Sequence, residues 1–198
     1  MVSIVIAAHN EEAVIGSCLD ALRSDTAGTA AQIIVSANGC SDRTAGIARE
    51  RGAIVIDRPE PGKPGALNAA DAVATGFPRI YLDADIRVPG GGVAALGRML
   101  DAQTLAVVPR RRVVLSGRPL AVKCYFAINE RLPVFRDGLF GRGMIALSQE
   151  GRSRFGEFPP MIADDLFLDS QFSTTEKAEA HDVEVLIEAP RTTRALVN

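Results

Sequence analysis

The chain has little that could form a disulfide framework or a zinc site. Its 198 residues include no tryptophan, three cysteines, two histidines and only 5% aromatic residues. An odd number of widely spaced cysteines predicts reduced thiols. Because no histidine and cysteine residues cluster, the sequence offers no zinc site. A metal site is therefore expected only among carboxylates.

Long apolar runs and a strong net charge are also missing. No segment approaches the run of about 18 apolar residues that marks a membrane span. The chain opens on a strand-like segment without a charged leader, so we expect no signal peptide and a cytoplasmic protein. The formal net charge of −2 gives no sign of nucleic-acid binding, and we expect no nucleic acid as a partner.

Common catalytic and nucleotide-binding motifs are absent or misplaced. There is no Gly-x-Ser-x-Gly, and neither histidine has an evident serine or cysteine partner, which disfavours a hydrolase. Residues 141–146 approximate a dinucleotide fingerprint, but they come late and lead into a strand-like stretch, so that reading is rejected. Residues 61–66 place a lysine among glycines without the spacing of a P-loop.

Strand-like and helical patterns alternate through the first half of the chain. Near-continuous apolar runs predict buried strands at residues 2–8, 32–37, 53–57 and 79–85. Helical spacing of apolar residues predicts intervening helices at 11–23, 42–51 and 64–76. This βαβαβαβ order predicts a parallel sheet with right-handed crossovers.

The second half is less regular. Its patterns predict helices at 91–102, 119–132 and 163–172 and strands at 104–115, 138–148 and 182–189. We expect a single α/β domain with a Rossmann-like, mostly parallel central sheet flanked by helices, and a smaller irregular second half. The charged residues within 109–154 are mostly basic and those within 155–188 mostly acidic, which fits a site that handles anions on one side and a cation or base chemistry on the other.

Polar residues follow three of the predicted strands. His9 to Glu11 follow the first, Asn38 the second, and Asp83 and Asp85 the fourth. Ligands of parallel sheets bind beyond the carboxyl ends of the strands. Two neighbouring aspartates suit a hard divalent cation such as Mg²⁺ or Mn²⁺ that is shared with substrate phosphates. Ordinary solvated loops are the alternative interpretation.

Five segments, in order along the chain, resemble family 2 glycosyltransferases of the GT-A fold. They read VSIVIAAHNEEAVIGSCLDAL, IIVSANGCSDRTAGIA, GKPGALNAA, YLDADIRV and FPPMIADDLFL. The resemblance implies metal-dependent transfer of a sugar from a nucleoside-diphosphate sugar to an acceptor hydroxyl, with inversion. It also implies a nucleotide-sugar-binding half at residues 1–88 and an acceptor-binding and catalytic-base half at 89–198. A role in cell-envelope or polysaccharide biosynthesis would follow.

The resemblance also implies roles for individual residues. Asp85 would hold Mg²⁺ or Mn²⁺ at the donor diphosphate, and Asp83 would contact the ribose or the water of the metal. The residues expected to bind the donor are His9, Asn10, Glu11, Asn38, Lys63, Asn68 and Asp83. By resemblance, Asn10, Glu11 and Asn38 would line the nucleobase pocket, and Lys63 and Asn68 would lie near the diphosphate or sugar. His9 is included because it follows the first strand at the same edge, where it could contact a flat nucleobase; plain loop packing is the alternative interpretation.

The late acidic pair would supply the catalytic base. By resemblance, Asp165 would take the proton of the acceptor and Asp164 would support it. Prolines precede the pair and a helical pattern follows, so both lie at a predicted helix N-terminus, which favours ionised carboxylates. Simple helix capping is the alternative interpretation.

Two departures from the family leave other readings open. Asn38 stands where the family commonly has an aspartate, and an amide both donates and accepts, so the nucleobase stays undecided. The Gln-x-x-Arg-Trp acceptor motif of processive family members is missing, because the chain contains no tryptophan. A sugar-1-phosphate nucleotidyltransferase and an inactive or truncated nucleotide-sugar-binding domain remain alternatives. The basic middle segment suggests an anionic or membrane-associated acceptor and a protein peripheral to the membrane.

Overall fold

The first half of the chain forms four adjacent strands of a mixed sheet. The computed structural model describes residues 1–132, 138–161 and 163–194. Within these residues seven strands pair in the order β3-β2-β1-β4-β6-β5-β7. The four strands of the first half are parallel: β1 (Val2–Ala8), β2 (Ala31–Asn38), β3 (Ile54–Arg58) and β4 (Arg79–Asp83). The predicted parallel sheet is confirmed, although β4 ends at Asp83 rather than Asp85.

Three strands from the second half complete the sheet. They are β5 (Ala106–Val114), β6 (Met144–Leu147) and β7 (Lys177–Glu188). β6 runs antiparallel to both β4 and β5, and β7 runs parallel to β5. The strand predicted at 138–148 is shorter because Gly141 and Gly143 take the left-handed φ values of 65° and 67°, which interrupt an extended chain.

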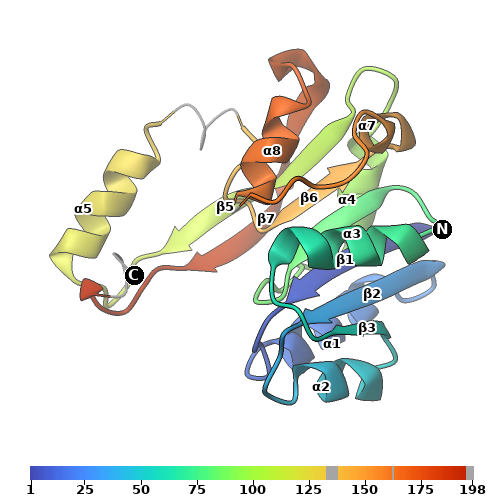
Figure 1. Cartoon of the computed structure of the whole chain (residues 1–198). Helices are drawn as coiled ribbons and strands as arrows, with labels where there is room; N and C mark the ends of the chain where they lie inside the picture. Colours follow the sequence, from blue (N-terminus) through green and yellow to red (C-terminus); the bar gives the residue numbers. More distant parts are fainter. Residues whose placement is uncertain (133–137, 162, 195–198) are drawn as a thin grey trace.

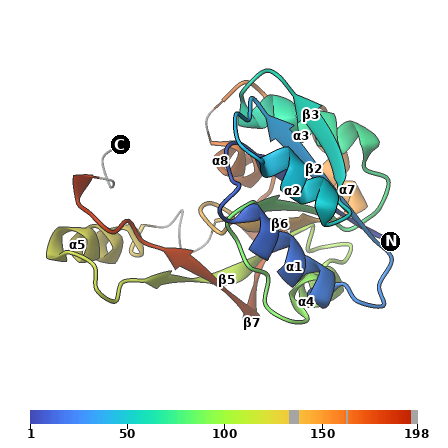
Figure 2. The same cartoon turned by 90° about the horizontal axis from the view of Figure 1, so that it is seen from below.

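Helices cover both faces of the sheet (Figure 2). The helices are α1 (Ile15–Asp25), α2 (Thr44–Glu50), α3 (Lys63–Val73), α4 (Gly92–Met99), α5 (Leu120–Asn129), α7 (Gln149–Ser153) and α8 (Asp164–Ser170), with a short 3₁₀ turn η1 (Thr174–Glu176). One apolar core joins β1 to α1 and α4 through residues such as Ile6, Leu19 and Leu96. The other joins the opposite face to α3 and α8 through Leu67 and Leu168.

Helix α5 contributes little to either core. In Figures 1 and 2 it stands apart from the rest of the molecule. Val122 is its one buried residue, whereas Leu120 and Ile128 are 76% and 61% exposed. Across the described parts of the chain, helices fall short of the length and apolarity needed to cross a membrane.

Candidate active site

Three parallel strands end at one edge of the sheet. The strand register pairs Ala8 with Ala37 and Ala7 with Asp83, so the ends of β1, β2 and β4 lie side by side. The loops that leave these ends carry the polar clusters from the first half of the sequence. The fold therefore brings these distant clusters together at the edge where parallel sheets bind ligands.

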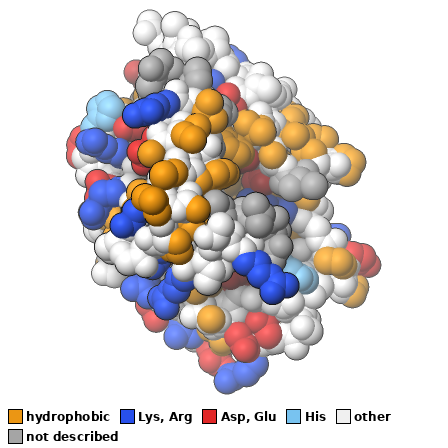
Figure 3. Space-filling model, turned by 90° about the vertical axis from the view of Figure 1, so that its left-hand side faces the viewer, with side chains coloured by type: hydrophobic (Ala, Val, Ile, Leu, Met, Phe, Trp, Pro, Cys, Tyr) orange, Lys and Arg blue, Asp and Glu red, His pale blue; other side chains and the backbone are white. Residues whose placement is uncertain are grey.

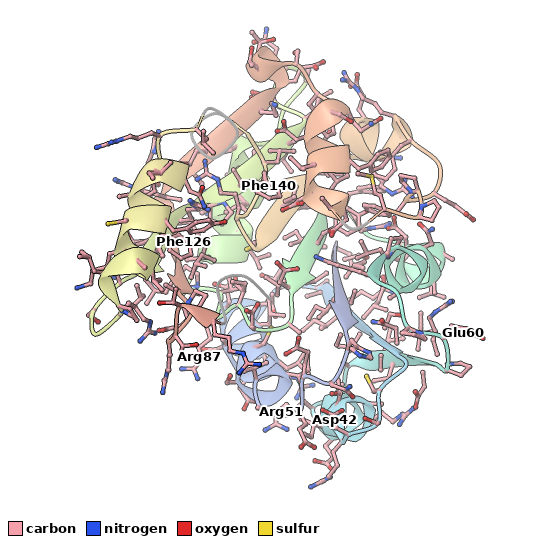
Figure 4. All side chains as sticks on the ribbon, turned by 60° about the vertical axis from the view of Figure 1, so that its left-hand side comes forward. Asp42, Arg51, Glu60, Arg87, Phe126 and Phe140 are labelled. Atoms are coloured by element: carbon pink, nitrogen blue, oxygen red, sulfur yellow. The ribbon has the colours of Figure 1, made fainter. Side chains whose placement is uncertain are left out.

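Hydrogen bonds join the loop after β1 to the loop after β2. The Asn10 side chain accepts from the backbone N–H of Ser41 (2.8 Å), and Asn10 has a left-handed φ of 55°. The N–H of Glu12 donates to Asp42 (3.1 Å), and the Glu12 carboxylate accepts from the N–H of Arg43 (3.1 Å). Figure 4 labels Asp42 just before α2. These reciprocal contacts fix the two loops relative to each other.

A cavity of about 440 Å³ lies between these loops and the start of α3. Its walls are formed by Ala7, His9, Glu11, Asn38, Pro61, Gly62, Lys63, Asp83, Ala84 and Asp85. Six of the residues expected at the donor or metal are therefore in its walls. Asn10 and Asn68 are not, and each makes other contacts.

Asn38 uses its amide to hold the cavity wall. Its Nδ2 donates to the carbonyl of Ala8 (2.8 Å), and its Oδ1 accepts from the N–H of Gly62 (2.9 Å). His9 donates from Nδ1 to the carbonyl of Asn38 (2.6 Å). An aspartate could not donate to the Ala8 carbonyl when ionised. The amide at position 38 thus ties the ends of β1 and β2 to the start of α3.

Lys63 joins two carboxylates from distant parts of the chain. Its Nζ lies 2.8 Å from Oδ1 of Asp83 and 3.0 Å from Oδ1 of Asp164. Burial lowers the pKa of Lys63, but the two carboxylates raise it by more, so the net pKa is above its ordinary value. Lys63 is therefore a permanent cation between the end of β4 and the start of α8.

Two carboxyl groups beside the cavity, those of Glu11 and Asp85, are destabilised in their ionised form. Burial raises the pKa of Asp85, and the neighbouring Asp83 raises it further. Burial, followed by Asp85 and Asp42, raises the pKa of Glu11. Each shift reflects the cost of removing a carboxylate from water and, to a smaller extent, of placing it beside other negative charges. A bound cation would relieve that cost.

The aspartate pair fits a divalent metal that is shared with a substrate. Among the residues that the structure describes, no group of three His, Cys, Asp or Glu side chains could hold a metal ion. Mg²⁺ sites commonly use one or two carboxylates and complete their shell with water and substrate phosphates. Asp83 and Asp85 supply that number of hard oxygen ligands, and their mutual repulsion favours a cation. The donor set fits Mg²⁺ or Mn²⁺.

The late acidic pair faces the same region. Asp164 and Asp165 line a narrow crevice together with Lys63, Asp83 and Gly143. Burial raises the pKa of Asp164, while Lys63 opposes that rise. Asp165 accepts from the N–H of Gly141 (2.9 Å) and from the N–H of Leu166 (3.0 Å). Both acids lie in the first turn of α8, as predicted.

Gly143 allows β6 to approach the end of β4. Its carbonyl accepts from the N–H of Asp83 (2.9 Å), and its φ is 67°. A Cβ at this position would lie 2.6 Å from the Ile86 side chain. The near-fingerprint at residues 141–146 is therefore a structural feature beside the site, and it leads into β6 rather than a helix.

Asn68 and Asp71 hold the second half against α3. The Asn68 amide makes two hydrogen bonds with the backbone of Phe158 (2.7 and 3.1 Å). The buried carboxylate of Asp71 pairs with Arg79 and with Arg152, the latter at 2.7 Å. Sequence reasoning missed this network because its partners come from 8 and 81 residues away.

Comparison with known proteins agrees with this geometry. A model of the family described as "Glycosyl transferase family 2" matches residues 3–149. The mannosyltransferase PcManGT from Pyrobaculum calidifontis, solved with GDP-Man and Mn²⁺, superposes with a TM-score of 0.76 at 22% identity. That match covers 96% of this chain and 57% of the mannosyltransferase, so the chain spans little more than half of that protein.

A second structure gives the same fold. Glucosyl-3-phosphoglycerate synthase from Mycobacterium tuberculosis, in complex with Mn²⁺, UDP and glucosyl-3-phosphoglycerate, superposes with a TM-score of 0.69 at 22% identity. The match covers all of this chain and 75% of the synthase. No curated protein matches the chain.

The sheet order and the two superposed structures define the fold of the chain as GT-A. The chain belongs to glycosyl transferase family 2, whose model covers most of its length. The resemblance drawn from the five sequence segments is thereby confirmed, as are the predicted fold and enzyme class.

Proposed function

We propose that the protein moves a sugar from a nucleoside-diphosphate sugar to an acceptor hydroxyl, with Mg²⁺ or Mn²⁺, by an inverting single displacement. The observation that carries this proposal is the Lys63 bridge. It joins Asp83 in the wall of the large cavity to Asp164 of the late acidic pair. Donor-binding and base-supplying groups thus form one continuous site.

The cavity beside the strand ends would hold the nucleotide. Its volume of about 440 Å³ is in the range of small-molecule sites. His9 and Glu11 would contact the nucleobase, whereas Asn10 and Asn38 would shape its pocket through their loop contacts. Asn68 would act through α3 by fixing that helix against Phe158.

The diphosphate would lie near Asp83, Asp85 and Lys63. A divalent ion held by Asp85 and Asp83 would neutralise the charge that develops on the departing diphosphate. Lys63 would add a second positive charge from the start of α3. This part of the proposal assigns residues 1–88 to the donor and residues 89–198 to the acceptor and the base.

Asp165 would act as the catalytic base. The acceptor oxygen bonds to the anomeric carbon while the bond from that carbon to the diphosphate oxygen breaks. The acceptor proton passes to Asp165, and the nucleoside diphosphate leaves with the bonding electron pair. The N–H groups of Gly141 and Leu166 orient this carboxylate. Asp164 would support it with a nearby negative charge, held in place by Lys63.

We propose an anionic or membrane-associated acceptor, consistent with a cytoplasmic protein peripheral to the membrane and a role in cell-envelope or polysaccharide synthesis. Hydrophobic side chains gather on the side of the molecule that carries α5 (Figure 3). On that helix Leu120, Tyr125 and Ile128 are exposed, and Lys123 is exposed beside them. Apolar and basic residues together favour a negatively charged lipid surface.

Vesicle flotation tests the membrane part. The protein should float with vesicles that contain phosphatidylglycerol and less with neutral phosphatidylcholine vesicles. Replacing Leu120 and Ile128 by serine should reduce flotation, because both side chains are already exposed and fold stability should change little. Equal recovery of both proteins with anionic vesicles would contradict membrane contact through α5.

Release of nucleoside diphosphate tests the proposed reaction. The protein would be incubated with UDP-, GDP- and dTDP-sugars in Mn²⁺, with and without EDTA. We expect slow, metal-dependent hydrolysis of at least one donor, which disappears in the Asp164→Asn/Asp165→Asn double variant. Donor binding without any release, also after an acceptor extract is added, would favour the inactive binding domain instead.

A further inference from the structure

The Lys63 side chain occupies the position of a counter-ion within the site. It is the first residue of α3 and follows Gly62, whose φ is 134°. From this fixed point its ammonium reaches both Asp83 (2.8 Å) and Asp164 (3.0 Å). The side chain of Asp164 is only 11% exposed, whereas those of Lys63 and Asp83 are 39% and 44% exposed. Lys63 and Asp83 are thus accessible to an incoming ligand.

A divalent metal and the Lys63 ammonium compete for the same carboxylate. Asp83 and Asp85 together repel each other as anions, and Lys63 partly offsets that repulsion. A metal that approaches Asp83 meets the positive charge of Lys63 at short range. The repulsion falls only if the ammonium moves away or if an anionic ligand arrives with the metal.

We propose that Lys63 is an exchangeable internal cation, an inference that rests on the proposed function. Without donor, its ammonium neutralises Asp83 and holds Asp164. When a metal and a nucleoside diphosphate bind together, Lys63 gives up Asp83 to the metal and transfers its hydrogen bonds to the diphosphate. Metal alone therefore binds weakly, and metal with diphosphate binds well. Lys63 is a positioning residue that makes the two ligands bind cooperatively.

The role differs from that of a lysine that only binds phosphate. A simple phosphate-binding lysine leaves the affinity for metal alone unchanged when it is removed. An exchangeable cation hinders metal binding, so its removal should strengthen the binding of metal alone. The same removal should weaken binding of nucleoside diphosphate in saturating metal.

Mn²⁺ titrations followed by electron paramagnetic resonance, at pH 7.5 and without nucleotide, measure this difference. Lys63→Met should bind Mn²⁺ about tenfold more tightly than wild type, since a charge repulsion over a few ångströms of solvated site is worth roughly one such factor. Lys63→Gln should behave in the same way and replaces Lys63→Met if that variant fails to fold. Arg98→Met, which removes an exposed cation on α4, controls for net charge and should match wild type.

UDP and GDP titrations in saturating Mn²⁺ complete the experiment. The better of the two nucleotides should bind at least tenfold more weakly to the Lys63 variants than to wild type. Mn²⁺ affinity that is unchanged, reduced or undetectable in both Lys63 variants would overturn the exchange role, even if wild type binds nucleotide. Failure of wild type to bind UDP, GDP and, titrated in the same way, dTDP would instead overturn the proposed function.

Discussion

The loops of the first half and helix α8 of the second half meet at one site, but different interactions hold them. The loops after β1 and β2 are tied by hydrogen bonds such as those of Asn10 and Glu12, most of them exposed. The segment before α8 is held by the buried Asp71 carboxylate through Arg152. The proposed donor side therefore depends on strand register and local loop contacts, and the side that carries Asp164 and Asp165 depends on a buried ionic network.

Aromatic packing extends that network to α8. Arg152 donates to the carbonyls of Phe155 (2.6 Å) and Gly156 (2.9 Å). The rings of Phe155 and Phe158 lie 5.3 and 5.8 Å from the ring of Phe167 in α8. This chain of contacts positions Asp164 and Asp165 at the site. Substitutions in the loops of the first half and in the buried network should therefore affect different properties of the protein.

The largest expected effect separates chemistry from donor binding. Asp165→Asn should lower turnover by roughly 10²–10⁴-fold, because the amide cannot take the acceptor proton. Donor affinity should stay near that of wild type, since the large cavity is lined by other residues. Steady-state rates with an identified acceptor and calorimetric donor titrations would measure the two properties.

A matched control distinguishes the base from a helix cap. The cap residue of α8 is Ala163, and Asp165 accepts from the N–H groups of Gly141 and Leu166. An amide oxygen accepts as well, so a purely structural role predicts near-normal turnover in Asp165→Asn. Glu157→Gln, at an exposed acid between α7 and α8, should leave turnover unchanged. Wild-type rates in Asp165→Asn would refute the base assignment.

The next effect concerns the buried network. Asp71→Asn should lower the free energy of unfolding by about 3 kcal/mol, because it leaves both the buried Arg79 and Arg152 of the second half without their ionised partner. Asp57→Asn breaks the half-exposed pair with Arg49 (2.8 Å) and should cost at most about 1 kcal/mol. Urea unfolding of both variants tests the contrast. Equal losses would show that the network does not hold the second half more firmly than a surface pair.

A smaller loss is expected from Asn38→Asp. An ionised aspartate would face the Ala8 carbonyl without a donor, which should cost about 1–3 kcal/mol of folding stability. A protonated carboxyl can donate to that carbonyl, so the loss should shrink as the pH falls below the pKa of the introduced carboxyl. Unfolding curves of wild type and Asn38→Asp between pH 4 and pH 8 would measure this pH dependence of the stability loss. A loss that is independent of pH would mean that the Nδ2 hydrogen bond is not the cause.

The smallest expected effect is a gain in folding stability rather than a loss. Burial and Asp83 raise the pKa of Asp85, so the folded chain binds more protons there than the unfolded chain. Stability is then lost as pH rises from the ordinary carboxyl pKa through the raised one. Because Asp85 is exposed, solvent screens much of this penalty, and Asp85→Asn should stabilise the metal-free protein only slightly at pH 7.

Thermal unfolding in EDTA measures this gain. It should shrink as the pH falls toward the ordinary carboxyl pKa and disappear below it, where the wild-type carboxyl is protonated in both the folded and the unfolded state. A variant that is less stable than wild type at pH 7 would argue that Asp85 makes a favourable contact in the absence of metal.

Sequence patterns predicted the first half of the fold well for a physical reason. Buried parallel strands such as Val2–Ala8 are continuously apolar, and their order along the chain dictates that the polar ends converge. The irregular half was harder. β7 begins at Lys177, five residues before the predicted strand, because its first residues alternate alanine with charged side chains. The short helix α7 was not predicted.

The candidate site was predictable where chemistry lies in local motifs. Asp83, Asp85 and the late acidic pair were identified in the sequence, and they line two cavities that have Lys63 and Asp83 in common. The contacts of Asn68 with Phe158 and of Lys63 with Asp164 depend on tertiary packing, which no local pattern encodes. The amide of Asn38 was predicted to line the nucleobase pocket, and it does line the cavity, but its polar atoms are bound to backbone.

The central claim is that Asp85 and a divalent metal together hold a nucleotide sugar beyond β4. Isothermal titration of UDP- and GDP-sugars into wild type and Asp85→Ala, each with Mn²⁺ and with EDTA, tests it most directly. We predict that wild type binds at least one donor in Mn²⁺ and loses it in EDTA, and that Asp85→Ala binds at least tenfold more weakly. Asp85→Ala binding the donor as tightly as wild type in Mn²⁺, or wild-type binding that EDTA leaves unchanged, would contradict the account.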